Sequence, residues 1–274
     1  MMDWINVLPK AGYLQEQLKN VLAKILTTGP VPKHIGFVMD GNRRFARKHK
    51  IELKEGHNAG FESMAKILEI CYECGVESCT VFAFSIENFK RNKFEVDWLM
   101  ELAKLRFSQM VEQGEICEQF GIKIKVLGDK SLLPIEVLKV LNQAEEITKN
   151  NNRAILNVCF PYTARNEITN SIKTIISKKT EVELIDEQLI ENNLYTKNQA
   201  PLDLLIRTSG VTRLSDFLLW QVVDKNVEIE LVDTLWPDLT PLHIIWILIK
   251  FSFKKNYSRQ RNNYDEDVGS KKVL

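Results

Sequence analysis

The sequence has no apolar run long enough to span a membrane and no excess of charge of either sign. Its most apolar segment, Leu239 to Phe253, is interrupted by His243 and Lys250, whereas a spanning helix needs about 18 or more consecutive apolar residues. The 37 lysines and arginines are balanced by 36 acidic residues, which argues against nucleic-acid binding by the chain as a whole. Since 45% of the 274 residues are apolar, the chain can fill the core of one or two globular domains.

Several motifs of catalytic and binding sites are also missing. The chain contains neither Gly-x-Gly-x-x-Gly nor Gly-x-x-x-x-Gly-Lys-Ser/Thr, the usual nucleotide motifs, and no Gly-x-Ser-x-Gly nucleophile elbow. Its five cysteines are an odd number, which favours reduced thiols over a disulfide framework. Cys71 and Cys74 form a Cys-x-x-Cys, but no second pair completes a zinc site, so we interpret them as two thiols on a helix.

What the sequence does contain is an alternation of strand-like and helix-like segments. The apolar runs of strand length are Ile35–Met39, Thr80–Phe84, Ile122–Leu127, Ala154–Phe160, Leu202–Ile206 and Val227–Val232. Helical periodicity predicts a long helix from about Glu95 to Phe120, others after Pro134 and near Arg165, and apolar helices from Phe217 and after Pro241. This alternation predicts an α/β fold with a central, mainly parallel sheet flanked by helices.

We divide the chain into three parts. Residues 1–31 hold an amphipathic segment that ends at Gly29-Pro-Val-Pro32. This segment is either a helix packed on the body or on a partner, or an interfacial membrane helix. Residues 32–253 form the predicted α/β domain, and residues 254–274 form a polar tail that we expect to be a mobile extension.

Unusual polar residues follow the first predicted strand, where ligands of open α/β sheets bind. Gly41 allows close backbone approach, while Arg43 and Arg44 can bind phosphate oxygens. Asp40 would repel a bare phosphate, but it fits beside one if Mg²⁺ lies between them. A solvated surface turn is the alternative interpretation.

Two further strand ends have the same character. Asn88 and Arg91 follow the strand that ends near Phe84, although an ordinary charged loop would contain the same residue types. Arg207, Arg213 and Ser215 surround Gly210 after a later strand and combine guanidinium, hydroxyl and backbone N–H groups suited to an anion. Together the three strand ends predict one cleft for two phosphorylated groups and a metal ion.

His57 lies near the start of the second predicted helix. The helix dipole at this position favours a neutral imidazole or a bound anion. A purely structural role at the helix start is the alternative.

Five ordered segments resemble the cis-prenyltransferase (undecaprenyl diphosphate synthase) family, with features of its eukaryotic dehydrodolichyl diphosphate synthase branch. They are His34–Arg44, Gly56-His57, Phe84–Arg91, Arg207–Ser215 and Leu235–Pro237. The resemblance covers residues 32–253. It implies a Mg²⁺-dependent transferase that elongates farnesyl or a similar allylic diphosphate by cis addition of isopentenyl diphosphates.

The resemblance also implies roles for individual residues. It assigns Asp40 to Mg²⁺, Asn88 and Arg91 to the region of the reacting carbons, and a larger set to the two diphosphates. That set comprises Gly41, Asn42, Arg43, Arg44 and His57 for the allylic diphosphate, and Arg207, Arg213 and Ser215 for isopentenyl diphosphate. By spacing, Glu228 matches a second metal ligand, with Glu230 as the fallback.

The growing product requires an apolar tunnel. Its candidate walls are the strands Thr80–Phe84 and Ala154–Phe160 and the helix around Trp98 to Phe107, although an ordinary core would contain the same residues.

Single-subunit members of the family carry an Arg-x-Gly near the C-terminus that reaches a phosphate across a dimer interface, but no arginine here begins one. The resemblance therefore implies a heteromer in which a non-catalytic, cis-prenyltransferase-like subunit supplies the Arg-x-Gly. Because a long polyprenyl product is insoluble in water, we expect a peripheral protein on the cytosolic face of the endoplasmic reticulum membrane. The alternatives are that this chain is the non-catalytic subunit, or a different phosphate-ester enzyme on a similar sheet.

Overall fold

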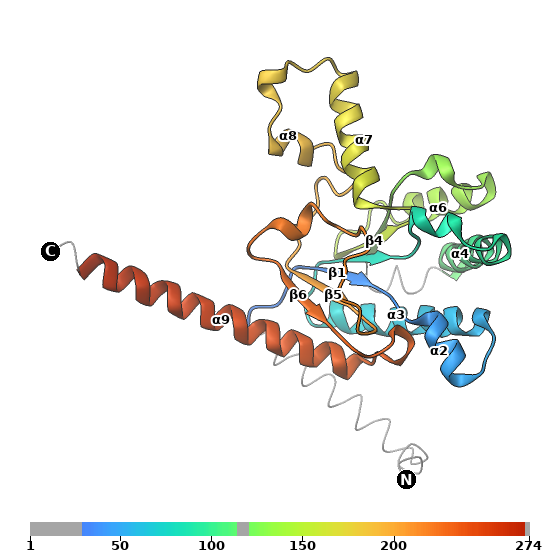
Figure 1. Ribbon diagram of the computed structural model, residues 1–274, viewed down its shortest axis with the longest axis horizontal. Helices are drawn as coiled ribbons and strands as arrows, with labels where there is room; N and C mark the ends of the chain where they lie inside the picture. Colours follow the sequence, from blue (N-terminus) through green and yellow to red (C-terminus); the bar gives the residue numbers. More distant parts are fainter. Residues whose placement is uncertain (1–28, 114–120, 272–274) are drawn as a thin grey trace, which may run out of the picture.

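A six-stranded parallel sheet forms the centre of the molecule in the computed structural model, which describes residues 29–113 and 121–271 (Figure 1). The strand order is β3-β4-β2-β1-β5-β6, and every neighbouring pair is parallel. The strands are β1 (His34–Val38), β2 (Ser78–Phe82), β3 (Ile122–Leu127), β4 (Ala154–Cys159), β5 (Leu204–Arg207) and β6 (Glu228–Leu231). The predicted α/β fold and all six predicted strands are confirmed, with boundaries that differ by at most two residues. The amphipathic segment predicted in residues 1–28 lies outside the described part of the chain.

The inner strands are nearly continuous apolar runs because helices and loops cover both of their faces. Every residue of β1 and β5 is buried, whereas the edge strand β6 alternates between glutamates and exposed aliphatic residues. The helices are α2 (Asn42–His49), α3 (Leu53–Glu73), α4 (Lys93–Gln113), α6 (Ile135–Ile147), α7 (Ala164–Ser177), α8 (Glu187–Glu191) and α9 (Pro241–Lys271). The main core joins the sheet to α3, α4, α6 and α9, and a smaller core includes the start of α7 and Phe217.

Two helix predictions are changed by the structure, and a third, the long helix from about Glu95, is tested only in part. The described part of α4 ends at Gln113, and residues 114–120 lie outside the described range. Helix α9 continues to Lys271, so the segment predicted as a tail from residue 254 begins as part of the last helix, which projects from the domain (Figure 1). The helix predicted from Phe217 is wrong, because Ser215, Asp216 and Leu218 have φ of 52°, 62° and 48°, a left-handed backbone that a right-handed helix excludes.

The predicted reduced state of the cysteines is confirmed for the described ones, since Cys71, Cys74, Cys79 and Cys159 are free and buried. A hydrogen bond with Cys79 and burial raise the pKa of Cys71, and burial raises that of Cys159, so neither thiol is a reactive thiolate. None of the helices in the described ranges has the length and apolar character needed to cross a lipid bilayer.

Candidate functional site

The carboxyl ends of β1, β2 and β5 open into one polar cleft of about 600 Å³. Parallel strands bring their carboxyl ends to the same edge of the sheet, so residues from distant parts of the sequence meet there. The predicted site residues that line the cleft are Asp40, Asn42, Arg43, His57, Asn88, Arg91, Arg207, Arg213 and Ser215. The three strand ends singled out in the sequence therefore line a single cleft.

Asp40 is fixed at the floor of the cleft by β5 and the residues that follow it. Arg207 Nη2 donates to Asp40 Oδ2 at 2.8 Å, and Arg44 Nη2 lies 3.6 Å from the other carboxylate oxygen. The Thr208 hydroxyl accepts from the Asp40 backbone N–H at 3.0 Å and donates to its carbonyl oxygen at 2.8 Å. The Asp40 carboxylate is thus held in one orientation, about one third exposed to the cleft.

Arg207 also holds the loop that follows β5. Its Nη1 donates to the carbonyl oxygen of Arg213 and, at 2.8 Å, to Ser215 Oγ. The side chain is only 2% exposed, and burial lowers its pKa while the Asp40 carboxylate raises it. Because a guanidinium stays protonated in proteins, Arg207 provides a buried positive charge that Asp40 only partly compensates.

Helix α2 begins at the cleft with the features of an anion site. Its N-cap, Gly41, has φ of 114°, and a Cβ there would lie 3.1 Å from Leu235. No side chain of the described residues caps this helix, so its first N–H groups are available to a ligand at the positive end of the dipole. Arg43 adds a cation beside them in the cleft lining.

Two glycines of α3 allow the first residue of α2 to lie against it. A Cβ at Gly56 would come within 2.7 Å of the Asn42 carbonyl oxygen, and one at Gly60 would overlap Asn42 Oδ1. Asn42 Oδ1 is buried and has no hydrogen-bond partner among the described residues. A buried acceptor without a partner is a place where an ordered water or an ion can bind.

His57 lies between the cleft and the apolar interior. Its ring is 5.7 Å from that of Trp98, and its Nε2 is buried without a partner in the described part of the chain. Burial lowers the pKa of His57 to about 4, with Glu95 opposing this and Arg91 and Arg43 adding to it. The neutral imidazole predicted from the sequence therefore follows mainly from desolvation.

Asn88 and Arg91, which follow β2, are each held by a residue close by in the chain. The backbone N–H of Ser85 donates to Asn88 Oδ1 at 3.1 Å, which leaves the Asn88 amide hydrogens for the cleft. Arg91 Nη1 donates to Glu95 Oε1 at 2.8 Å, and both side chains are largely buried. Donors and cations thus face the cleft from this side too.

The Leu235-Trp-Pro237 segment packs against the Asp-Gly-Asn turn that follows β1. Trp236 is buried; its backbone N–H donates to the Asp40 carbonyl oxygen at 3.0 Å and its indole N–H to the Gly60 carbonyl oxygen at 2.7 Å. Trp236 therefore fixes the Asp-Gly-Asn turn against α3.

Glu228 and Glu230 do not join the cleft. Glu228 is the first residue of β6 and pairs with Leu204, whereas the cleft lies beyond Arg207, about 10 Å further along the strands. Glu228 lies 2.9 Å from Lys254, and Glu230 is paired with Lys250. The assignment of Glu228 as a metal ligand therefore stays a prediction, and within this chain the residue lies outside the cleft that contains Asp40.

Arg165 and Asp216 form a charged pair in the cleft that was not assigned a role from the sequence. Arg165, near the start of α7, donates from Nε to Asp216 Oδ2 at 2.7 Å and from its backbone N–H to Asp216 Oδ1 at 3.0 Å. Both side chains line the cleft, and the Asp216 side chain is only 12% exposed. Arg165 follows the end of β4, so the strand-end argument used elsewhere would have found it.

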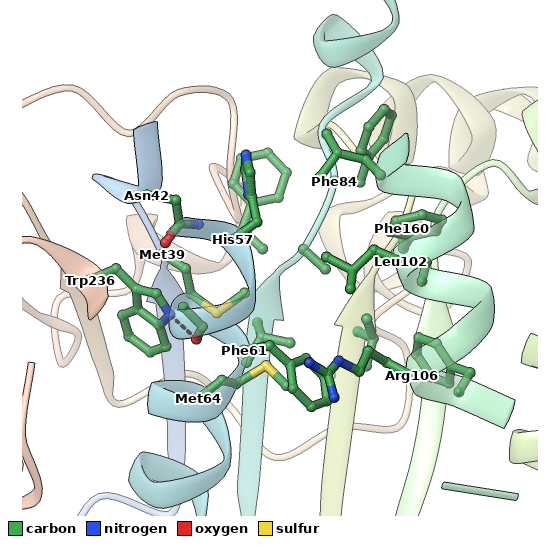
Figure 2. A pocket seen from close by; sticks show the side chains of 18 of the residues that line it. Met39, Asn42, His57, Phe61, Met64, Phe84, Leu102, Arg106, Phe160 and Trp236 are labelled. Carbon is green, nitrogen blue, oxygen red and sulfur yellow. Dashed lines mark hydrogen bonds between the residues drawn. The ribbon is translucent and has the colours of Figure 1, made fainter. Parts of the chain in front are cut away.

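An apolar cavity of about 140 Å³ adjoins the polar cleft (Figure 2). Met39, Asn42 and His57 line both spaces. The rest of the cavity wall includes residues from all three predicted walls: Val81, Phe82 and Phe84 from the β2 segment, Leu156, Val158 and Phe160 from the β4 segment, and Leu99, Leu102, Ala103, Arg106 and Phe107 from α4. These side chains enclose free space and are not only an ordinary packed core.

Comparisons with known proteins agree with this arrangement. The sequence profile of the undecaprenyl diphosphate synthase family matches residues 38–259. A dehydrodolichyl diphosphate synthase complex subunit of Schizosaccharomyces pombe is 46% identical over 258 residues, covering 93% of this chain and 97% of the relative. A human subunit of the same description is 43% identical over 272 residues, covering 97% and 79%. The crystal structure of lavandulyl diphosphate synthase from Lavandula x intermedia with dimethylallyl diphosphate is similar at a TM-score of 0.77 and 29% identity, covering 81% and 95%.

Proposed function

Because the chain belongs to the undecaprenyl diphosphate synthase family of cis-prenyltransferases, and is thus a transferase, we propose that it is the catalytic subunit of a dehydrodolichyl diphosphate synthase. Its substrates are farnesyl diphosphate and isopentenyl diphosphate, which it condenses in successive cis additions to a long polyprenyl diphosphate for dolichol synthesis and protein glycosylation.

The observation that carries this proposal is the continuity of a cationic cleft with an apolar cavity. An allylic diphosphate has a strongly anionic head and an apolar tail, and His57 and Asn42 lie where the two spaces meet. The cleft contains separate arginines for two head groups: Arg43 at the start of α2, and Arg213 beside the buried Arg207. A subunit without catalytic activity would have no need for both sets.

The charges of the cleft fit the chemistry of the transfer. Departure of the allylic diphosphate leaves negative charge on the leaving group, which Arg43 and the free N–H groups of α2 are placed to stabilise. The cations around Arg213 hold the second diphosphate, so that the reacting carbons of the two substrates are close. The Asn88 amide also lines the cleft and would orient the isopentenyl group.

The cleft also fits Mg²⁺. Protein sites hold this ion through one or two carboxylates together with substrate phosphate oxygens, and Asp40 is a fixed, accessible carboxylate beside both arginine sets. No cluster of three or more histidine, cysteine or acidic ligands occurs in the described ranges, which suits an ion held jointly with substrate. When bound, Mg²⁺ would neutralise diphosphate charge and assist its departure.

A second subunit is supported by an exposed apolar stripe on α9. Leu242, Trp246 and Phe253 fall on one side of this helix and are 55%, 61% and 77% exposed. They lie in the helix that packs beside edge strand β6, where Ile229 and Leu231 are also exposed. Exposed apolar patches of this kind mark protein interfaces, and the missing Arg-x-Gly is what the partner would supply. The two curated relatives are themselves described as complex subunits.

We place the enzyme at the cytosolic face of the endoplasmic reticulum membrane, as a peripheral protein. The product carries a long apolar chain that water does not dissolve, so release into a lipid phase favours turnover. The role of the relatives in dehydrodolichyl diphosphate synthesis is consistent with this location.

The proposal is tested by incorporation of radiolabelled isopentenyl diphosphate into farnesyl-primed products, with and without an Arg-x-Gly subunit. We expect Mg²⁺-dependent polyprenyl products with the subunit and weak activity without it. Asp40→Asn should lower kcat by roughly 100-fold or more, whereas Glu77→Gln, in an exposed ion pair with Lys33, should change it less than twofold. Full activity of Asp40→Asn would refute the assigned site.

A further inference from the structure

The apolar cavity is smaller than the chain that the proposed reaction builds. Its volume is about 140 Å³, and an apolar cavity of about 150 Å³ accommodates one benzene molecule, a ligand of six carbons. The cavity thus holds about one five-carbon isoprene unit. Each further condensation pushes the tail deeper, so part of the cavity wall has to move for elongation to continue.

Arg106 forms the wall at the end of the cavity away from the cleft. Figure 2 shows its side chain reaching from α4 toward Phe61 on α3, with His57 and Asn42 at the opposite end. The guanidinium carbon lies 4.6 Å from the centre of the Phe61 ring. Phe61 is about one helical turn beyond His57 on α3, so a tail that passes His57 meets the Arg106–Phe61 contact next.

Arg106 is held only by neutral partners in the described part of the chain. Its Nη2 donates to Asn58 Oδ1 at 3.3 Å and its Nη1 to Gln109 Oε1 at 3.1 Å, both neutral acceptors. Its Nε is buried without a partner, and the described residues offer it no ion pair. By contrast, Met64 and Phe107 on the same wall belong to the buried main core.

A guanidinium on an apolar wall is also suited to movement. Arginine can keep its aliphatic stem along apolar surface while the charged head moves out to water. If the Arg106 guanidinium leaves the Phe61 ring, it loses one cation–π contact and two hydrogen bonds to neutral acceptors, and it gains hydration. The aliphatic stem would then form part of the wall of a longer channel.

We propose that Arg106 is the gate of chain elongation, a specificity-determining residue whose displacement from Phe61 admits the growing tail and whose size limits product length. This inference rests on the proposed function. The gate is closed in the geometry described above, and the tail opens it from within.

The test is the length distribution of labelled products made by the complex of this chain with its Arg-x-Gly subunit. Arg106→Ala removes the gate and should shift the distribution longer by one or more isoprene units, whereas Arg106→Trp fills the space and should shift it shorter. Phe61→Ala removes the surface on which the guanidinium rests, so it should act like Arg106→Ala and add little to it in the double variant. Leu105→Ala is the matched control, because Leu105 is its 53% exposed neighbour on α4.

The outcomes separate the two proposals. If the wild-type complex elongates farnesyl diphosphate but Arg106→Ala and Phe61→Ala leave product lengths unchanged, the gate is refuted and the proposed function stands. A shift of equal size in Leu105→Ala would also refute it, by showing a general effect of α4. If the wild-type complex makes no polyprenyl product, the proposed function fails, and the gate fails with it.

Discussion

The guanidinium of Arg207 donates a 2.8 Å hydrogen bond to the carboxylate of Asp40, although the two residues are 167 positions apart in the chain. The pair is formed because β1 and β5 are parallel neighbours whose ends meet at one edge of the sheet. Arg207 also holds the loop at Arg213 and Ser215. A single buried cation therefore connects the Asp-Gly-Asn turn to this loop. This link places the two proposed diphosphate sites at a fixed separation.

The first prediction concerns the isopentenyl diphosphate site. The Arg213 side chain is exposed in the cleft, while its backbone oxygen is bound by Arg207. A charged hydrogen bond contributes about 1.5–3 kcal/mol, so Arg213→Gln should raise KM for isopentenyl diphosphate roughly 10- to 100-fold. KM for farnesyl diphosphate should change less than threefold in steady-state assays of the complex.

Arg47→Gln is the matched control, since Arg47 lies in the last turn of α2, outside the cleft lining. An Arg213→Gln variant with equal increases in both KM values would contradict the separation of the two sites.

The second prediction concerns the contact between Arg165 and Asp216. This pair holds a loop in which Ser215 and Asp216 have left-handed φ, a conformation that costs free energy and persists only when neighbours enforce it. Asp216→Asn weakens the charged contact, so KM for isopentenyl diphosphate should rise several-fold with a smaller change in kcat.

Asp186→Asn is a control of the same chemistry, because Asp186 caps α8 and asparagine caps helices equally well. Arg165→Lys should retain more of the wild-type KM than Arg165→Met. An unchanged KM in both Asp216→Asn and Arg165→Met would show that the contact does not position the loop.

The third prediction concerns the fit of α2 against α3. Alanine is favoured over glycine in a helix by about 0.5–1 kcal/mol, but a Cβ at Gly60 overlaps Asn42 Oδ1. Because overpacking costs about 1–3 kcal/mol, Gly60→Ala should lower the free energy of unfolding, measured by urea denaturation.

The sign of the effect should reverse in an Asn42→Ala background, where the overlap is absent and helix propensity remains. A double-mutant cycle measures this coupling directly. Equal effects of Gly60→Ala in both backgrounds would mean that Asn42 does not occupy the space over Gly60.

The fourth prediction is a pH dependence of stability. His57 has a pKa of about 4 in the folded chain, against about 6.5 when unfolded. Between these values the unfolded chain binds a proton that the folded chain does not, so the His57 contribution to stability is lost as the pH falls from about 6.5 to about 4. The loss is at most about 3 kcal/mol, and smaller because the imidazole is partly exposed.

His57→Gln removes this titration and leaves the other groups, including His34, unchanged. The free energy of unfolding of the wild type minus that of the variant should therefore decrease from pH 6.5 to pH 4.5, because only the wild type loses the His57 contribution. Parallel curves over this range would show that His57 titrates normally in the folded protein.

Much of the fold could be predicted from local sequence patterns. An inner parallel strand is a short apolar run, and this pattern can be recognised without knowing which strands lie beside it. The cleft could be predicted for a related reason. All strands are parallel, so residues that follow Met39, Phe84 and Ile206 reach the same edge whatever the strand order.

What the sequence could not show depends on tertiary context. Ser215, Asp216 and Leu218 have a left-handed backbone, although none of them is a glycine that would indicate it. The apolar residues of this loop therefore gave a wrong helix prediction. The contact between Arg165 and Asp216 depends on that same backbone. Motif spacing also does not fix the end of β6 at which Glu228 lies, so its position relative to the cleft could not be read from the sequence.

The most direct test of the central claim is a crystal structure of the chain with its Arg-x-Gly subunit, Mg²⁺, isopentenyl diphosphate and a non-reactive farnesyl thiodiphosphate. The account predicts that the farnesyl head group lies on the turn from Asp40 to Arg43 and that its tail passes His57 toward Phe61. Isopentenyl diphosphate should lie against Arg207 and Arg213. A head group bound away from that turn, or a tail lying outside the cavity, would contradict it.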